Sequence, residues 1–240
     1  KGDTIWNCKT SALSLSGLTS MGSHQLNYKW STTDGKFTGQ GDRADLLIEN
    51  YGTYKLVVED QRNGCTAETS FTVKPDLNVP QLRLDQALSI TCLRTTVVLT
   101  ATVNQQGSAN SKAWYTVLGN FVGSPLEDTV RVDKAGYYYY RFTNLDNDCS
   151  VVDSVLVTED KTPPKGTAGS DGQLTCSVSE VHLNGNADPG TEVEWTTQDG
   201  VIVGDVNSLQ VTAQKEGTYV LRISSLTNGC ETTDTVKISK

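Results

Sequence analysis

The sequence contains very little histidine, little methionine and no long apolar segment. It has 2 His and 1 Met in 240 residues, and no run approaches the roughly 18 apolar residues that a membrane helix needs. Two histidines leave little material for a His-rich metal site or for several acid–base centres. Basic residues are also in the minority, because 20 Lys and Arg stand against 28 Asp and Glu, for a net charge of −8. We therefore predict no membrane span in this segment and no nucleic-acid partner, since phosphate backbones are bound by basic surfaces.

An internal repeat is present, and the six cysteines mark it most clearly. The first cysteines of the three repeats are equally spaced, and the second cysteines keep the same period except that the last one comes slightly early. A tryptophan follows each first cysteine, and the distance from this tryptophan to the next landmark, a tyrosine, is identical in all three repeats. Repeat by repeat, these landmarks are Cys8, Trp30, Tyr54 and Cys65; Cys92, Trp114, Tyr138 and Cys149; and Cys176, Trp195, Tyr219 and Cys230.

Apolar residues alternate with polar ones in each repeat, which is the pattern of half-buried strands. Tyr54, Leu56 and Val58 show this alternation, and the same register recurs in the other two repeats. An Asn-Gly or Asn-Asp pair follows each such segment, and these residues favour tight hairpin turns. No segment carries a persuasive helical period. The chain is therefore predicted to be all-β, with three small β-sandwiches of about seven short strands each.

Proline-containing segments end the last strand of the first two repeats. These segments, at 74–80 and 159–164, divide the chain into predicted domains at residues 1–76, 77–160 and 161–240. The first domain is short at its front, and we expect it to have been cut from a longer array of such repeats.

The cysteines form one pair per repeat, which favours disulfides and an oxidising compartment. Zinc is the rival interpretation, but each repeat offers two isolated cysteines and no repeated histidine, whereas structural zinc takes four clustered ligands. Free buried thiols are the other alternative. Six cysteines allow 15 connectivities, from which repetition selects one bond within each repeat, placed near the edge or end of its sandwich. The expected pairs are Cys8 with Cys65, Cys92 with Cys149, and Cys176 with Cys230.

A cysteine, a strand, a glycine five residues after the tryptophan, a Gly-x-Tyr segment and an Asn-Gly-Cys hairpin recur in this order along the whole chain. This order resembles the PKD-like or Ig-like tandem repeats of very large secreted proteins of the Bacteroidota. Gly217-Thr218-Tyr219 and Asn228-Gly229-Cys230 look typical of that family, whereas Asn147-Asp148-Cys149 departs from it in a turn. The resemblance implies Ig-like or PKD-like sandwiches in a stalk or adhesin on a bacterial cell surface, or in a secreted fibre exported by the type IX system. Together with the cysteine pattern, it predicts three such domains arranged end to end with one disulfide per domain.

No residue pattern indicates catalysis. His24 and His182 occupy non-equivalent positions without a partner pattern for a nucleophile, so both are interpreted as surface residues. The tryptophans could be imagined as a sugar-stacking platform, but their fixed spacing to the tyrosines favours core packing. We therefore expect no catalytic residue, no cofactor and no metal. The predicted core residues are Trp30, Trp114, Trp195, Tyr54, Tyr138 and Tyr219.

Calcium between domains is an alternative for the linkers. The segment 75–80 contains Asp76-Leu77-Asn78, which is similar to the Asp-x-Asn linker of cadherin-type repeats, and Glu59, Asp60 or Asp160 could add oxygen ligands. The second linker places Lys161 where a ligand should be, which weighs against this alternative.

The function predicted from these features is a non-enzymatic extracellular structural repeat that forms the shaft of a bacterial surface fibre or adhesin. Its expected partners are other repeats of the same long chain, in a fibre that could be homo-oligomeric. The alternative is a glycan-binding or spacer module attached to a secreted hydrolase, and the outward Tyr137 and Tyr139 are the candidate glycan contacts. A protein ligand at the surface loops is a third hypothesis.

Overall fold

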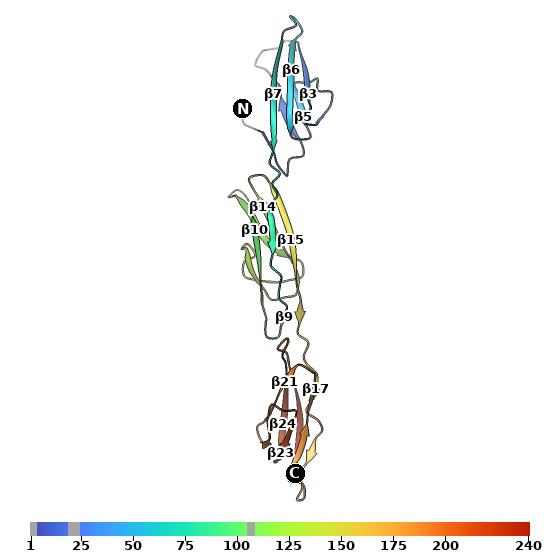
Figure 1. Ribbon diagram of the computed structural model, residues 1–240, viewed down its shortest axis with the longest axis vertical. Coiled ribbons are helices and arrows are strands. Elements are labelled where there is room, and N and C mark those ends of the chain that lie inside the picture. Colours follow the sequence, from blue (N-terminus) through green and yellow to red (C-terminus); the bar gives the residue numbers. More distant parts are fainter. Residues whose placement is uncertain (1–3, 19–24, 105–108) are drawn as a thin grey trace. The chain divides into compact units, whose positions relative to one another are not determined.

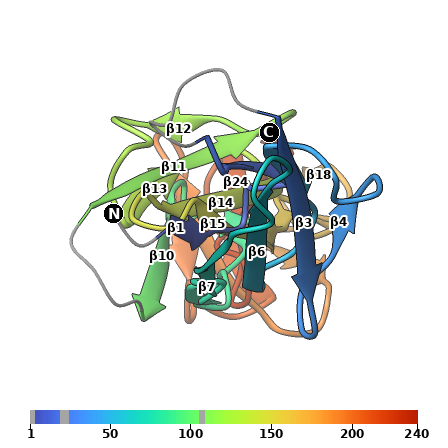
Figure 2. The same ribbon diagram turned by 90° about the horizontal axis from the view of Figure 1, so that it is seen from above.

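The computed structural model describes residues 4–18, 25–104 and 109–240, and every regular element in these ranges is a strand. Figures 1 and 2 accordingly show arrows and loops without coiled ribbon. In the described ranges there is no helix with the length and apolarity to cross a membrane. The prediction of an all-β chain is confirmed.

The first repeat folds into two facing sheets around its tryptophan. One sheet has the order β1-β7-β6-β3, and the other has the order β2-β5-β4. The strands are β1 (Thr4–Trp6), β2 (Leu13–Ser16), β3 (Leu26–Thr32), β4 (Phe37–Thr38), β5 (Asp45–Ile48), β6 (Gly52–Asp60) and β7 (Thr66–Pro75). The core between the sheets consists of Trp6, Leu15, Trp30, Leu46, Ile48, Tyr54, Leu56 and Val73.

The middle repeat contributes sheets of order β12-β13-β10-β8 and β11-β14-β15, together with the short pair β16-β9. Its strands are β8 (Gln81–Leu84), β9 (Ile90–Thr91), β10 (Val97–Asn104), β11 (Asn110–Thr116), β12 (Phe121–Val122), β13 (Thr129–Val132), β14 (Gly136–Asn144), β15 (Cys149–Val157) and β16 (Glu159–Asp160).

The third repeat has sheets of order β18-β25-β24-β21 and β19-β23-β22, and the pair β17-β20. Its strands are β17 (Gly166–Thr167), β18 (Gly172–Gln173), β19 (Val181–Asn184), β20 (Asn186–Ala187), β21 (Thr191–Thr197), β22 (Ile202–Val203), β23 (Gln210–Ala213), β24 (Gly217–Ser225) and β25 (Glu231–Ser239). Trp195, Tyr219, Leu183, Leu221 and Ile223 are the largest fully buried side chains of its core.

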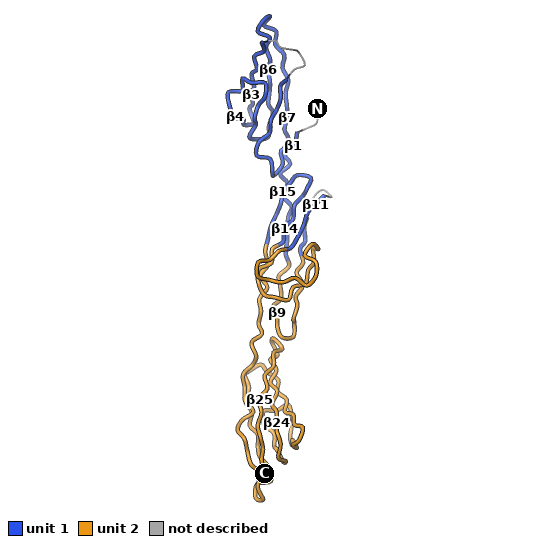
Figure 3. Tube along the Cα trace, turned by 180° about the vertical axis from the view of Figure 1, so that it is seen from behind, with its two compact units in different colours: residues 1–84, 101–114, 140–153 blue, residues 85–100, 115–139, 154–240 orange. Residues whose placement is uncertain are grey.

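The chain divides into two compact units that do not follow the sequence repeats (Figure 3). The division passes through β10, β11, β14 and β15 of the middle repeat, so the expected domain boundaries stay a prediction. Unit 1 comprises residues 1–84, 101–114 and 140–153, and unit 2 comprises residues 85–100, 115–139 and 154–240.

A buried tyrosine fixes the same corner of each repeat. Tyr54 Oη donates to Asn50 O over 2.6 Å and accepts from Lys36 N over 3.0 Å. Tyr138 and Tyr219 likewise donate, over 2.6 Å, to the backbone oxygen four residues upstream. Burial raises the pKa of the Tyr54 and Tyr138 hydroxyls. This hydrogen bond is the tyrosine corner of the immunoglobulin fold.

The glycine five residues after each tryptophan makes room for this tyrosine. A Cβ at Gly200 would lie 2.5 Å from Tyr219 Oη, which is closer than carbon and oxygen can approach without displacement. Gly35 and Gly119 face their own tyrosines in the same way. The recurring glycine is therefore a packing requirement of the corner.

Two further features are shared with immunoglobulin-like sandwiches. Each repeat carries its tryptophan on the strand that pairs with its tyrosine strand, in β3 beside β6, β11 beside β14 and β21 beside β24, as immunoglobulin domains carry theirs on strand C beside strand F. Each repeat also pairs a short early strand in parallel with the end of its last strand, as β1 does with β7 and β18 with β25. The chain is thus built of tandem Ig-like β-sandwich repeats.

Candidate functional site at two disulfide-linked joints

Both disulfides of the structure connect one repeat to the next. Cys8 is bonded to Cys149 with a Cα–Cα distance of 4.9 Å, and Cys92 is bonded to Cys230 with a Cα–Cα distance of 5.0 Å. Each bond lies within a single compact unit, the first in unit 1 and the second in unit 2. In both, the first cysteine of one repeat meets the second cysteine of the following repeat. We call these two places the joints.

The expected pairing within repeats is therefore wrong, and so is the expectation of one disulfide per domain. In the first repeat, Cys65 directly precedes β7, whereas Cys8 follows β1, whose Trp6 is paired with Pro75 at the far end of β7. Ten residues of strand span about 30 Å, and a disulfide needs Cα atoms within about 7 Å.

The same geometry separates the cysteines of the third repeat. Cys230 directly precedes β25, and Leu174, two residues before Cys176, donates its backbone N–H to Ser239 O at the end of that strand. The repeat pattern predicts Cys65 to be bonded to Cys8 and Cys176 to Cys230. Both Cys65 and Cys176 are instead free thiols, and both are exposed.

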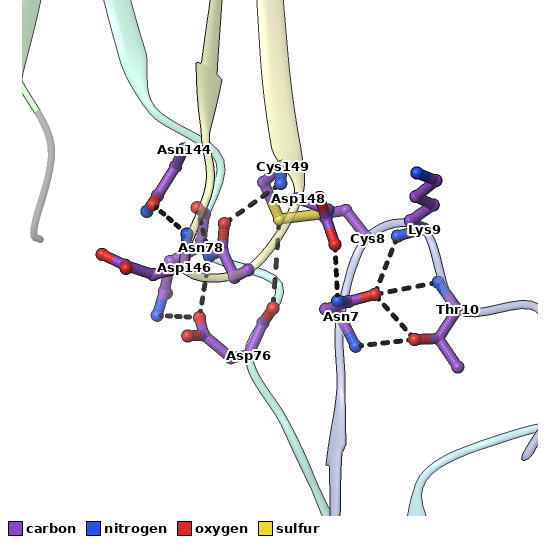
Figure 4. Close-up of a disulfide and its surroundings, with 11 residues drawn as sticks. Asn7, Cys8, Lys9, Thr10, Asp76, Asn78, Asn144, Asp146, Asp148 and Cys149 are labelled. Carbon is purple, nitrogen blue, oxygen red and sulfur yellow. Dashed lines mark hydrogen bonds between the residues drawn. A yellow bond between two sulfur atoms is a disulfide. The ribbon is translucent and has the colours of Figure 1, made fainter. Parts of the chain in front are cut away.

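A buried asparagine, Asn147, holds the first joint together. Figure 4 shows the disulfide of this joint with Asp76, Asn78 and Cys149 beside it. The Asn147 side chain is fully buried, with 0% exposure. Its Nδ2 donates to Asp76 Oδ1 over 2.9 Å and to Asn78 O over 3.1 Å, both in the linker after β7. Its Oδ1 accepts from Cys149 N over 3.0 Å. One amide thus connects the linker to the disulfide-bonded residue of the next repeat.

The second joint repeats this arrangement at equivalent positions. Asn228 Nδ2 donates to Asp160 Oδ1 over 3.1 Å and to Thr162 O over 2.9 Å. Asn228 Oδ1 accepts from Cys230 N over 2.9 Å. The two linker aspartates are separated by the same interval as the first cysteines of consecutive repeats. The residues that form the joint therefore recur with the period of the sequence repeat.

These hydrogen bonds lower the pKa values of the linker carboxylates. The pKa of Asp76 lies below its ordinary value, chiefly because the Asn147 amide donates to the ionised form. The pKa of Asp160 is also lowered, first by the backbone N–H of Thr162 and then by the Asn228 amide. Both aspartates are therefore ionised in the formed joint at neutral pH.

The residue after each joint asparagine also contacts the cysteine turn that faces it. Asp148 adopts a φ of 56° at the hairpin tip and accepts a 3.0 Å hydrogen bond on Oδ2 from Asn7 Nδ2. Gly229 adopts a φ of 67° at the same place, and a Cβ there would lie 2.7 Å from Leu93 Cβ. The middle repeat has Asp148 where the third repeat has Gly229. This difference matches the turns that face them, which present Asn7 in the first joint and Leu93 in the second.

The six aromatic side chains expected in the core are all buried. Their exposures are 4% for Trp30, 2% for Trp114, 1% for Trp195 and 0% for Tyr54, Tyr138 and Tyr219.

The remaining predicted residues lie away from the joints. His182 is exposed, with Nδ1 3.1 Å from Thr212 Oγ1, whereas His24 lies outside the described residues.

The linker aspartates weighed as calcium ligands are occupied by amide donors instead. Asp76 Oδ1 accepts from Asn78 Nδ2 over 3.0 Å as well as from Asn147. In the parts of the chain that the structure describes, no group of three or more His, Cys, Asp and Glu is placed to hold a metal ion.

The sequence pattern predicts Asn147 and Asn228 only as turn residues. The recurrence of an aspartate in each linker is the signal that could have indicated their hydrogen bonds to the linkers.

Comparisons with known proteins return only structural likenesses. No protein-family model matches the chain, and no curated protein matches it. Among solved structures, the chain is similar to the I67–I69 fragment of titin, at 12% identity and a TM-score of 0.42, over 100% of this chain and 95% of that one.

Two further likenesses are to fragments of a cell-adhesion molecule and of a bacteriophage protein. The eight N-terminal Ig domains of Down Syndrome Cell Adhesion Molecule have a TM-score of 0.43 at 13% identity, over 100% of this chain and 36% of that one. The three N-terminal domains of the outer capsid protein Hoc of bacteriophage RB49 have a TM-score of 0.35 at 14% identity, over 99% of this chain and 95% of that one. At TM-scores below 0.5, none of these likenesses assigns a family or a function to the chain.

Proposed function

We propose that this chain is a non-enzymatic extracellular structural segment that forms part of the shaft of a bacterial surface fibre or adhesin. The observation that carries the proposal is that both disulfides connect consecutive repeats, where they restrain the joints instead of the sandwich interiors. Disulfides persist in oxidising compartments, which supports a place outside the cytoplasm. Restrained joints are useful where tandem modules must transmit tension.

The covalent connectivity supports a load-bearing role. Under tension, the shortest covalent route crosses from Cys8 to Cys149, follows the chain back to Cys92 and crosses again to Cys230. From end to end, this route uses about a third of the 240 residues. Both linkers lie outside it. Once the route is taut, the linkers carry no load.

A chain that can be cut shortly after the first linker tests this role. A protease site inserted between Gln86 and Ala87 lies in the loop between β8 and β9, outside the joint contacts. After cleavage, a molecule held by its two termini should still bear tension, because Cys8 and Cys149 bridge the cut. Reductant should release it.

The matched control carries Cys8→Ser and Cys149→Ser together with the same protease site. This variant should separate on cleavage without reductant, because the disulfide between Cys92 and Cys230 does not span the cut. If the cleaved chain with all six cysteines separates under oxidising conditions, the load-bearing role is refuted.

Glycan binding is a second candidate function, and one group of tyrosines favours it. Tyr115 and Tyr139 are stacked with ring centroids 5.2 Å apart, and Tyr137 lies 6.4 Å from Tyr139. Tyr137 is 54% exposed and Tyr115 is 39% exposed. Aromatic side chains are common in ligand sites. A glycan array probed with the chain and with a Tyr137→Ala/Tyr139→Ala variant tests this function, and an array without hits excludes it for the glycans tested.

A further inference from the structure

The two free cysteines belong to the two kinds of element that make a joint. Cys65 follows the tip of the β6–β7 hairpin, as Cys149 and Cys230 follow theirs. Cys176 lies in the turn after β18, and its equivalents Cys8 and Cys92 are bonded in the joints. The chain thus carries one unused hairpin, residues 60–65, and one unused turn, residues 175–178.

The unused hairpin already has the shape of a bonded one. Gly64 N donates to Asp60 O over 2.8 Å, Asp60 N to Cys65 O over 2.9 Å, and Cys65 N to Asn63 Oδ1 over 2.9 Å. The equivalent three hydrogen bonds at the Cys230 hairpin measure 3.0, 2.9 and 2.9 Å. This hairpin therefore needs no rearrangement to enter a joint.

The unused turn is preformed in the same way. Thr175 N donates to Val178 O over 2.9 Å, and Val178 N lies 3.1 Å from Thr175 Oγ1. In the bonded turn of unit 2, Thr91 N donates to Arg94 O over 2.8 Å, and Arg94 N donates to Thr91 Oγ1 over 2.9 Å. The turn therefore adopts the same shape with a free cysteine as with a disulfide-bonded one.

The hairpin surface that would face a turn is also open. Among the described residues, Asn63 Nδ2 has no hydrogen-bond partner, whereas the amides of Asn147 and Asn228 are buried in joints. A Cβ at Gly64 would meet nothing within 4 Å, whereas one at Gly229 would meet Leu93. The donor and the contact surface used in both joints are therefore unoccupied here.

We propose that the turn of Cys176 receives the hairpin of Cys65 from a second copy of this chain, and that the two thiols form a disulfide. The contact is head to tail, because different surfaces of the two copies meet, so it extends to longer assemblies unless the ring closes. The proposal rests on the geometry of the joints and is independent of the fibre role.

The bond requires a two-electron oxidant, for which a small disulfide such as oxidised glutathione is sufficient. The Cys176 thiolate attacks glutathione disulfide and releases one glutathione thiolate. The Cys65 thiolate of the second copy then attacks the mixed disulfide at the Cys176 sulfur and releases the second glutathione. Two protein thiols are thereby oxidised while one glutathione disulfide is reduced to two glutathione molecules.

The test uses the full chain and two single variants, Cys65→Ser and Cys176→Ser, in a buffer of oxidised and reduced glutathione. The unmodified chain should give a ladder of reducible oligomers on a non-reducing gel. Each variant alone should remain monomeric. An equimolar mixture of the two variants should give one heterodimer, in clear excess over any dimer that either variant forms alone. Peptide mapping should find Cys176 bonded to Cys65.

Three results would overturn the proposal. One is that either variant alone dimerises as well as the mixture, because the bond then forms without recognition. Another is that the unmodified chain stays monomeric with both cysteines capped by glutathione. The third is a bond between Cys65 and Cys176 of the same chain. Mapping of the Cys8–Cys149 and Cys92–Cys230 disulfides in every variant shows that its joints are intact.

Discussion

Asn147 and Asp76 are far apart in the sequence, yet Asn147 Nδ2 donates to Asp76 Oδ1 over 2.9 Å. The same amide group accepts from Cys149 N through its oxygen. A single side chain therefore joins the linker of one repeat to the cysteine of the next, which is itself bonded to Cys8. The hydrogen bonds of Asn147 and the disulfide between Cys8 and Cys149 therefore stabilise the same joint.

Replacing the joint asparagine should weaken the second joint. Asn228→Ala removes two donors to the linker and the acceptor of Cys230 N, and leaves the linker oxygens with fewer partners. Loss of hydrogen bonds at a buried site costs about 1 to 3 kcal/mol. Urea unfolding of the oxidised chain, followed by a probe in unit 2, should show a loss of this size.

Asn63→Ala is the matched control for that variant. It removes the same hairpin bond to the following cysteine, here Cys65 N, but no contact with a linker. Its effect on the free energy of unfolding should be clearly smaller than that of Asn228→Ala. Equal losses would mean that the turn, and not the linker contact, explains the effect.

The joints should be sensitive to acid. Asp76 and Asp160 have lowered pKa values in the folded chain. Their contribution to stability is therefore complete above the unfolded value of about 3.8, and it is lost as the pH falls through the lower folded values. Stability should decrease below about pH 4, and an Asp76→Asn/Asp160→Asn variant should lose part of that decrease when urea unfolding at neutral pH is compared with unfolding in acid. An unchanged pH profile would contradict the assignment.

The tyrosine corner should account for a measurable part of the stability of the third repeat. Tyr219→Phe removes the hydroxyl that donates to Lys215 O and accepts from Val201 N. Losing these part-buried hydrogen bonds should cost about 0.5 to 1.5 kcal/mol in thermal or urea unfolding. Tyr137→Phe, at a half-exposed ring, is the control and should change stability by less than about 0.5 kcal/mol.

Removing one joint disulfide should destabilise unit 1 more than any single polar change. The bond between Cys8 and Cys149 closes a loop of sequence separation 141, for which the chain-entropy model gives about 5 kcal/mol. The Cys8→Ser/Cys149→Ser variant should show faster hydrogen exchange in unit 1, while exchange in unit 2 should change little. Uniform acceleration in both units would indicate that they do not unfold separately.

Much of the fold could be predicted because the alternation of apolar residues along the sequence determines which side chains of each strand face the core. The fixed spacing from Trp30 to Tyr54 predicted a shared core, and both residues are buried. The alternation around Tyr54 predicted a strand, which is β6. The glycine after the tryptophan was recognised as a landmark, but its reason, the hydroxyl of the corner tyrosine, depends on a contact between distant residues that spacing does not reveal.

The disulfide pairing could not be obtained from repetition alone. The period of the repeat is satisfied equally when Cys8 bonds Cys65 and when it bonds Cys149, because both schemes recur. The two schemes are distinguished by the length of β7, which separates Cys65 at its start from Cys8 beside its far end. Cys8 is placed there by the parallel pairing of β1 with the end of β7, and the sequence does not reveal this pairing. The role of Asn147 was missed for the same reason, since its partner Asp76 belongs to the preceding linker.

The link between neighbouring repeats imposes an order on biosynthesis. Cys8 is bonded to Cys149, so the first repeat keeps a reduced thiol until the middle repeat has been synthesised and has folded. Because a completed sandwich holds its own two cysteines at opposite ends of a strand, folding before oxidation protects the chain from mispairing. Oxidation of a repeat before it has folded would allow a bond between its own two cysteines, which the folded sandwich keeps apart.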